Sequence, residues 1–254
     1  EVVLFHTLDH KHELEFECKD SNQISITRYT LETLKSPLAE VLLEIDPAFI
    51  DKPEHWPKSI PIKGILRAAK EDSKLLSRIK GYDWRNYWLG AHERELLYHS
   101  MDKMVSLSMK EILDMYVAPL NTKWKGSFDL VPDFYNKDAY HFLAYIFPKK
   151  LHQTMTHIHG KVSTRWNIKR ARGEKIAARR AIVISLRHFW KEITDWNMLK
   201  ELFRISKTDT IISIMGEDHR RNLTEVFKGL QLLTAQKGEE GKCVSLMKTV
   251  YIKK

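Results

Sequence analysis

Four potential metal ligands lie close together near the start of the chain: His6, Asp9, His10 and His12. Imidazole nitrogens and carboxylate oxygens are ordinary ligands of zinc and other transition metals. The same residues also fit a polar loop that leads into the first strand of a hairpin. We favour the loop, and we therefore expect no metal site in this segment and no cofactor.

A second group with chemical potential is His157-Ile158-His159, which would place two imidazoles on one face of a strand. Metal-dependent nicking enzymes that act on single strands use this spacing, together with a nucleophilic tyrosine on a nearby helix. Tyr140 and Tyr145 precede the histidine pair, and Tyr251 is the tyrosine that follows it. The set is incomplete, so a metal-dependent nuclease is the least favoured of our interpretations.

The sequence Glu17-Cys18-Lys19 has the acid-x-Lys spacing that nucleases of the restriction type use on a strand. Such enzymes also need an upstream aspartate, and Asp9 lies uncomfortably close for that role. The chain contains no phosphate-binding loop, no nucleophile elbow and no cysteine spacing typical of zinc. No acid, base, nucleophile and orienting group fall into a recognisable set, so we assign no catalytic residue and expect no catalysis.

The strongest electrostatic feature is the basic stretch 161–187, which holds nine Lys or Arg and one acid, Glu174, an excess of eight positive charges. Basic side chains on a helix face neutralise phosphates without sequence preference, and an aromatic ring can stack on a base. A solvated helix face fits the same pattern and is the interpretation we favour. The residues expected to contact nucleic acid in the alternative are Arg165, Trp166, Lys169, Arg170, Arg172, Lys175, Arg179 and Arg180.

Composition places the chain among globular proteins. It has 254 residues, 43% hydrophobic and 30% charged, with a net charge of +9. That basic balance permits a nucleic acid, an anionic membrane surface or an acidic protein as a partner. No run of eighteen apolar residues occurs, so we expect no membrane span. The two cysteines, Cys18 and Cys243, favour a reducing compartment, and we expect an intracellular protein, cytoplasmic or nuclear.

The elements that must position these residues begin with a short strand at 1–5. Alternating apolar residues predict a hairpin over 11–27, and apolar residues at threes and fours then predict a helix over about 30–44. Further along we expect a loop at 46–57, a strand at 59–65 and helices at 66–79 and 83–118. The longer helix is expected to break at Ser106-Leu107-Ser108.

A polar segment with Gly126 and Pro132 predicts a linker at 121–132. We therefore expect a domain at 1–124 and a second, basic and mainly helical domain at 125–254. The longest helical stretch should run from 176 to 205 with a break near Thr194-Asp195, and 244–252 should close the chain as a strand or a helix. The expected fold class is α+β, a small hairpin-and-helix N-terminal domain followed by a mostly α-helical C-terminal domain.

The order strand, turn, strand, helix, loop and short strand resembles the opening of the BTB/POZ fold, and more narrowly the Skp adaptor family of cullin ubiquitin ligases. The resemblance covers about residues 11–120. It rests on LEFECKDSNQISITRYTLETLKSPLAEVLLEI at 14–45, IPIKGI at 60–65, DWRNYWL at 83–89 and ELLYHSMDKMVSLSMKEILDMY at 95–116. The turn glycine of the family is replaced by Asn22, and residues 125–254 have no counterpart in the family.

The resemblance implies a non-enzymatic adaptor that binds another protein, in a setting of the ubiquitin-ligase type, through apolar helix faces. The candidate contact residues are Leu38, Val41, Leu42, Leu107, Ile112, Leu113 and Tyr116. Two alternatives stay open beside the adaptor: a nucleic-acid-binding protein that uses 161–187, and a metal-dependent nuclease.

Overall fold

The computed structural model describes residues 2–7, 23–119, 137–166, 172–204, 208–230, 233–234, 243–245 and 251–252. The chain divides into two compact units. Unit 1 comprises 1–83 and 204–254, and unit 2 comprises 84–203. Unit 2 is therefore an insertion, in sequence, within unit 1. This division differs from the expected boundary between 124 and 125, which lies in a part of the chain outside the described residues.

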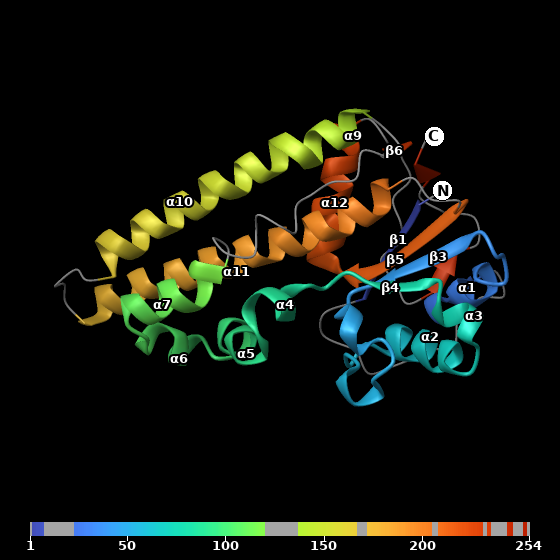
Figure 1. Cartoon of the computed structure of the whole chain (residues 1–254), viewed down its shortest axis with the longest axis horizontal. Coiled ribbons are helices and arrows are strands. Elements are labelled where there is room, and N and C mark those ends of the chain that lie inside the picture. The colour runs from blue at the N-terminus through green and yellow to red at the C-terminus, as the bar shows by residue number, and fades with distance from the viewer. Residues whose placement is uncertain are drawn as a thin grey trace. The chain divides into compact units, whose positions relative to one another are not determined.

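Unit 1 is built on a four-stranded sheet in the order β1-β5-β3-β4. Its strands are β1 (Val2–Thr7), β3 (Ala39–Leu43), β4 (Ile79–Gly81) and β5 (Thr210–Gly216), and every pairing is parallel. Within this sheet, β5 is the last strand in sequence, and it lies between β1 and β3, with Val41 opposite Ile212 and Thr7 opposite Gly216 (Figure 1). Residues distant in sequence therefore meet at the centre of the sheet.

Helices and short strands surround this sheet. The helices of unit 1 are α1 (Ile26–Thr33), α2 (Ile60–Lys70), α3 (Ser73–Leu76) and α12 (Glu217–Gly229), with 3₁₀ turns at Pro47–Phe49 and Pro53–His55. The short strand β2 (Gln23–Ser25) pairs antiparallel with β7 (Cys243–Ser245), and β6 (Leu233–Thr234) pairs antiparallel with β8 (Tyr251–Ile252). The end of the chain thus contains strands, one of the two forms expected there.

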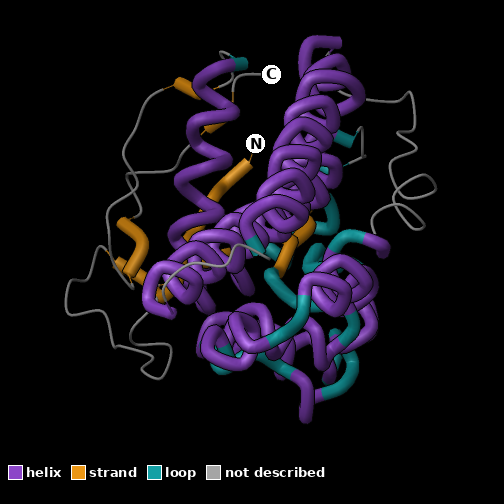
Figure 2. The backbone as a smooth tube through the Cα atoms, turned by 90° about the vertical axis from the view of Figure 1, so that its left-hand side faces the viewer, coloured by secondary structure: helices purple, strands orange, loops and turns teal. Residues whose placement is uncertain are grey.

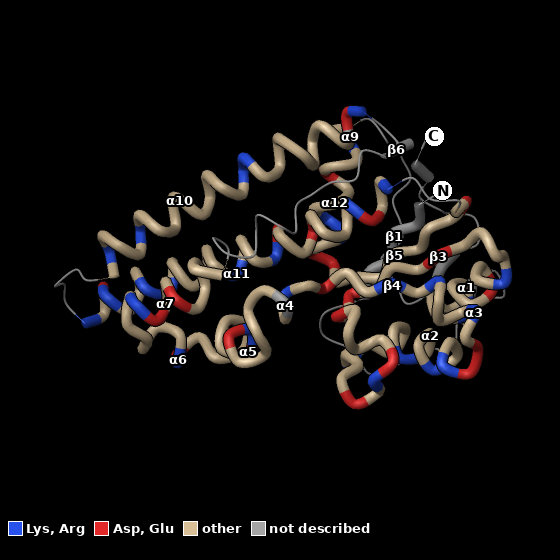
Figure 3. Tube along the Cα trace, in the orientation of Figure 1, with Lys and Arg blue, Asp and Glu red and all other residues tan. Residues whose placement is uncertain are grey.

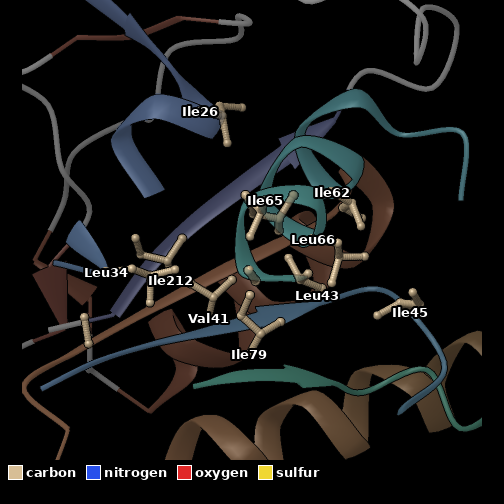
Figure 4. Close-up of a cluster of buried hydrophobic side chains, with 13 residues drawn as sticks. Ile26, Leu34, Val41, Leu43, Ile45, Ile62, Ile65, Leu66, Ile79 and Ile212 are labelled. Atoms are coloured by element: carbon tan, nitrogen blue, oxygen red, sulfur yellow. The ribbon is translucent and has the colours of Figure 1, made fainter. Parts of the chain in front are cut away.

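The core of unit 1 lies between one face of the sheet and helices α1 and α2. Val41 and Leu43 of β3 and Ile212 of β5 meet side chains of α2 such as Ile65 and Leu66 (Figure 4). These side chains are almost fully buried. Removing this apolar area from water, at about 25 cal/mol per Å², is the main favourable contribution to the stability of such a core.

The expected helix over 30–44 is wrong in its second half, where residues 39–43 form the buried strand β3. α1 ends at Thr33, and Pro37 stands between the two elements, where it cannot continue a helix. A strand buried on both faces reads as a continuous apolar run, without the polar alternation of a half-buried strand. Such a run also contains apolar residues at threes and fours, which is why it imitated a helix.

The expected strand over 59–65 and the expected helix over 66–79 are also wrong. α2 begins at Ile60 with Pro61 in its first turn, a position where proline costs no helical hydrogen bond. Its buried residues are Ile62, Ile65, Leu66 and Ala69, the spacing of one helix face. Gly81 ends the strand β4 and does not cap a helix.

Unit 2 contains helices and no strand among its described residues (Figure 2). The helix expected over 83–118 consists instead of four short helices: α4 (Arg85–Leu89), α5 (Ala91–His99), α6 (Met101–Ser106) and α7 (Met109–Tyr116). The predicted break at Ser106-Leu107-Ser108 is confirmed. Ser108 caps α7 with its side chain, and Glu111 returns the bond in a capping box.

Two long helices complete unit 2. α9 (Lys137–His141) continues through a π-helical turn, Phe142–Ile146, into α10 (Phe147–Arg165). α11 (Arg172–Phe203) runs without the expected break, and Thr194 and Asp195 are buried inside it. Trp196 Nε1 donates a hydrogen bond to the carbonyl of Leu143 in the π-helical turn, at 3.1 Å. The side chain of α11 thus satisfies a carbonyl in the wider turn.

The expected combination of a mostly helical chain with a small amount of strand is confirmed. Of the predicted hairpin over 11–27, residues 23–27 are described. They form β2 and the start of α1. The rest of that hairpin lies outside the described residues. The expected strand at 1–5 is confirmed as β1.

Candidate functional site

The carboxyl ends of β3 and β5 lie side by side in the sheet of unit 1. The chain after β3 leads to α2, on the face that carries the hydrophobic core. The chain after β5 enters α12 at once. Glu44 alternates away from the core face and reaches His219 of α12, so α12 covers the opposite face. Adjacent strands whose connections leave toward opposite faces create a crevice at their carboxyl ends, and ligands of open parallel sheets bind there.

Glu44 and His219 meet at this switch point. His219 Nε2 lies 3.3 Å from Glu44 Oε1, and the imidazole is only 6% exposed. The other carboxylate oxygen, Oε2, accepts a hydrogen bond from the backbone N–H of Gly216 at 2.8 Å. Gly216 is the N-cap residue of α12 and makes no side-chain cap bond, because glycine has no side chain. The carboxylate of Glu44 is therefore fixed by two contacts, and a backbone donor at a helix N-terminus favours its negative charge.

The first turn of α12 contains a second ion pair. Arg220 donates from Nε to Glu217 Oε2 at 2.8 Å and from Nη2 to Glu217 Oε1 at 2.7 Å. The two parallel bonds form a bidentate fork, the strongest arrangement of an arginine and a carboxylate. Both side chains are mostly buried. Residues 216, 217, 219 and 220 thus belong to one closely held turn.

The end of β4 is joined to the same edge of the sheet. Tyr82 is buried, and its hydroxyl donates to the carbonyl of Ile214 in β5 at 3.2 Å. The N–H of Tyr82 donates to the carbonyl of Leu43, and the N–H of Asp83 donates to that of Ile45. These bonds hold the segment after β3, which carries Glu44, against the two neighbouring strands.

The predicted metal ligands are only partly within the described residues. His6 lies in β1 opposite Met215 in the register. Asp9, His10 and His12 lie outside the described residues, and Glu17-Cys18-Lys19 does too. In the part of the chain that the structure describes, no group of three or more His, Cys, Asp and Glu residues could hold a metal ion.

The residues expected to contact a protein partner are mainly core. Val41, Leu42, Ile112 and Tyr116 are fully or almost fully buried. The hydroxyl of Tyr116 donates to the carbonyl of Glu93 at 2.9 Å, and burial raises the pKa of this tyrosine above its usual value. Leu107 and Leu113 are partly buried, and Leu38 is the exposed member, at 44%. An apolar stripe in sequence was thus mostly core, and in this structure its buried members cannot reach a partner.

Several residues of the basic stretch hold unit 2 together. Trp166 is buried, and its Nε1 donates to the carbonyl of Leu107 at 3.1 Å. Arg179 lies over the Trp166 ring, 4.5 Å from its centroid, and donates to the carbonyl of Val105 at 2.6 Å. Burial lowers the pKa of Arg179 from its usual value. Neither side chain is available to stack on a base.

The other members of the stretch differ in exposure. Arg165 and Arg172 are exposed, and Lys175 is half-buried. Arg180 is exposed and pairs with Asp102 of α6 at 2.9 Å. Lys169 and Arg170 lie outside the described residues. Figure 3 shows basic positions spread along α10 and α11, with acidic positions among them on α11.

His157 and His159 lie on α10, so the expectation that they share one face of a strand is wrong. Side chains that are two positions apart on a helix point in directions about 200° apart, since each residue advances by about 100°. Both side chains are exposed. The nicking-enzyme pattern therefore has no structural basis here.

The sequence interpretation missed Glu44 and His219. Each stands just beyond a run of apolar residues, Ala39–Leu43 and Thr210–Gly216. A polar residue directly after a buried strand lies at the carboxyl edge of a parallel sheet, and that signal was available. It was lost because Ala39–Leu43 had been interpreted as helix.

Comparison of the chain with protein-family models, with curated proteins and with solved structures finds no match. The resemblance to the BTB/POZ fold and the Skp adaptor family gains nothing from these comparisons. Two of the segments that carry it, at 30–44 and 60–65, contain other elements than those expected. Among the described residues, no helix is both long enough and apolar enough to span a membrane.

Proposed function

We propose that unit 1 is a hydrolytic enzyme in which His219, oriented by Glu44, acts as the general base. The observation that carries this proposal is the contact between His219 Nε2 and Glu44 Oε1 at the switch point of a parallel sheet. Sequence alone favoured the absence of catalysis, because no catalytic set was recognisable. Glu44 and His219 are 175 positions apart in the chain. Only the pairing of β3 with β5 brings them together.

The chemistry follows from the two contacts of the carboxylate. His219 Nε2 lies 3.3 Å from Glu44 Oε1, so in the proposed reaction the carboxylate orients the ring. The imidazole takes a proton from a water molecule as the water attacks an acyl carbon, and the imidazolium then returns the proton to the leaving group. Glu44 stabilises the positive charge of the ring, and the N–H of Gly216 prevents the carboxylate from turning away.

The experiment measures hydrolysis of chromogenic esters with short and long acyl chains by the purified full chain. Glu44→Gln keeps an oxygen that can accept the Gly216 bond but removes the charge, and His219→Gln removes the base. We expect both variants to lose about a hundredfold or more in kcat, within the range that general-base catalysis contributes. Wild-type activity should fall as the pH drops, because a general base must be neutral.

A matched control is Glu40→Gln in β3, because Glu40 precedes Glu44 by four residues and pairs with Lys80 of β4 at 3.0 Å. It should hydrolyse the esters at the wild-type rate. Circular dichroism and urea unfolding establish that all variants are folded. If folded His219→Gln retains full activity on every ester that the wild type hydrolyses, His219 is not the base and the proposal fails.

The partner predictions made from sequence stay predictions. A protein partner bound through apolar faces and a nucleic acid bound through 161–187 are both untested, as is an intracellular location. Both proposed partners would have fewer exposed side chains to contact than the sequence indicated. The side chains that are buried or bonded within the chain are Val41, Leu42, Ile112, Tyr116, Trp166 and Arg179.

A further inference from the structure

Two contacts join Glu44 to the start of α12 in the proposed site. Gly216, directly before the helix, donates its N–H to Glu44 Oε2, and His219 in the first turn contacts Oε1. Helix ends fray because their first N–H groups have no partner within the helix. A loose first turn would displace the backbone donor and the imidazole from Glu44 together.

We propose that Arg220 is a positioning residue, which closes the first turn of α12 through its bidentate bond to Glu217 and so holds Gly216 and His219 against Glu44. This inference rests on the proposed function, because it assigns a role within the same site. The fork joins the first helical residue to the fourth, with donor distances of 2.8 and 2.7 Å. A planar guanidinium bound at two points restricts the turn more than a single flexible contact does.

The location of Arg220 supports a role beyond helix stability. A positive charge in the first turn of a helix is unfavourable to the helix dipole. The dipole favours a negative charge at this position, such as that of Glu217. Glu217 offsets the unfavourable charge of Arg220 because the two side chains are paired. Arg221, the next residue, is largely exposed and lies 3.9 Å from Glu217 Oε1, too far for a hydrogen bond. The mostly buried fork is therefore specific to Arg220.

The charged groups around His219 limit what a variant of Arg220 changes. They include Glu44, directly after β3, and Glu217, Asp218 and Arg220 in the first turn of α12. Arg220→Gln breaks the fork and also leaves Glu217 with a charge that the fork had neutralised. The double variant Glu217→Gln with Arg220→Gln removes the fork without that unbalanced charge. Comparing the two separates positioning from charge.

The experiment has one readout that needs no activity and one that does. Amide hydrogen exchange of Gly216 reports whether the first turn holds its N–H against Glu44, and ester hydrolysis reports the consequence for the reaction. We expect faster exchange at Gly216 and a kcat lowered about tenfold with KM unchanged, in both the single and the double variant, as for other supporting residues. Arg220→Lys, which makes one bond instead of two, should recover part of both.

The matched control is Lys228→Gln, which breaks an exposed pair of the same i,i+3 spacing at the other end of α12, between Lys228 and Glu225. It should change neither readout. Unchanged exchange at Gly216 in Arg220→Gln would overturn the inference, and so would full activity in the double variant. If His219→Gln stays active while Arg220→Gln still speeds exchange, the proposed reaction fails and the positioning of the turn stands.

Discussion

At the scale of single residues, the missing side chain of Gly81 allows two segments of backbone to approach each other closely. A Cβ at this position would overlap the carbonyl oxygen of Ile45 and lie 2.9 Å from the nitrogen of Pro47. Backbone atoms of a packed segment cannot move aside as a flexible side chain can. We expect Gly81→Ala to lower the free energy of unfolding of unit 1 by about 2 kcal/mol, in the range of overpacked sites.

Urea unfolding measures this effect, with Gly229→Ala as the control in the same unit. No atom lies within 4 Å of the Cβ that Gly229→Ala would add at the end of α12. Alanine there should leave stability unchanged or raise it slightly. Equal stability of the two variants would show that the segment after β3 can retreat from β4.

Arginines of the basic stretch differ at the same scale. Arg179 bonds the carbonyl of Val105 and covers the Trp166 ring, whereas Arg172 is exposed at the start of α11. We expect Arg179→Ala to destabilise unit 2 by about 2 kcal/mol, because it leaves a partly buried carbonyl without its charged donor. Arg172→Ala should change stability by less than about 0.5 kcal/mol. Thermal unfolding of both variants checks this. If Arg179→Ala is nearly as stable as the wild type, the contacts of Arg179 contribute little to stability.

At the scale of elements, α7 depends on its capping box. Ser108 Oγ accepts from Glu111 N–H at 3.2 Å, and the N–H of Ser108 donates to Glu111 Oε2 at 2.7 Å. This backbone bond holds the pKa of Glu111 below its usual value of 4.5. A carboxyl with a depressed pKa stabilises the fold above that usual value, and the contribution is lost as the pH falls through the depressed pKa.

We therefore expect Ser108→Ala to cost about 1 kcal/mol near neutral pH, as loss of a serine cap does. Glu111→Gln should be less stable than the wild type near neutral pH and equally stable well below pH 4.5, where the wild-type carboxyl is protonated too. Urea unfolding of wild type and variants across this window measures both effects. A difference between Glu111→Gln and wild type that does not change with pH would contradict the assigned charge effect.

At the scale of the whole molecule, unit 1 is completed only by the last part of the chain. β5 lies between β1 and β3, and Ile212 and Ile214 belong to the core. Residues 1–83 alone should therefore remain unfolded by circular dichroism, and adding 204–254 should restore structure. Residues 84–203, a compact unit of their own, should be helical and unfold cooperatively. A folded 1–83 fragment would show that β1 and β3 can pair without β5.

The sequence by itself determined which segments are apolar, that a helical region breaks at Ser106-Leu107-Ser108, and that helices dominate the chain. These features depend on neighbours within a few residues, and the capping box of Ser108 and Glu111 lies at that break. It could not decide between helix and strand for Ala39–Leu43, because burial on both faces removes the alternation that distinguishes a strand. It also could not separate core from interface at Val41 or Tyr116, since both roles need the same apolar side chain.

Only the tertiary structure decided the candidate site. Glu44 and His219 are ordinary residues in their own segments, and no local sequence pattern marks either of them. They meet because β5 inserts between β1 and β3 and α12 then covers the face opposite the core. Such a parallel arrangement depends on contacts between residues far apart in the chain, which no local pattern encodes. The same reason explains Trp166 and Arg179, whose bonds to Leu107 and Val105 hold both side chains within the helical unit.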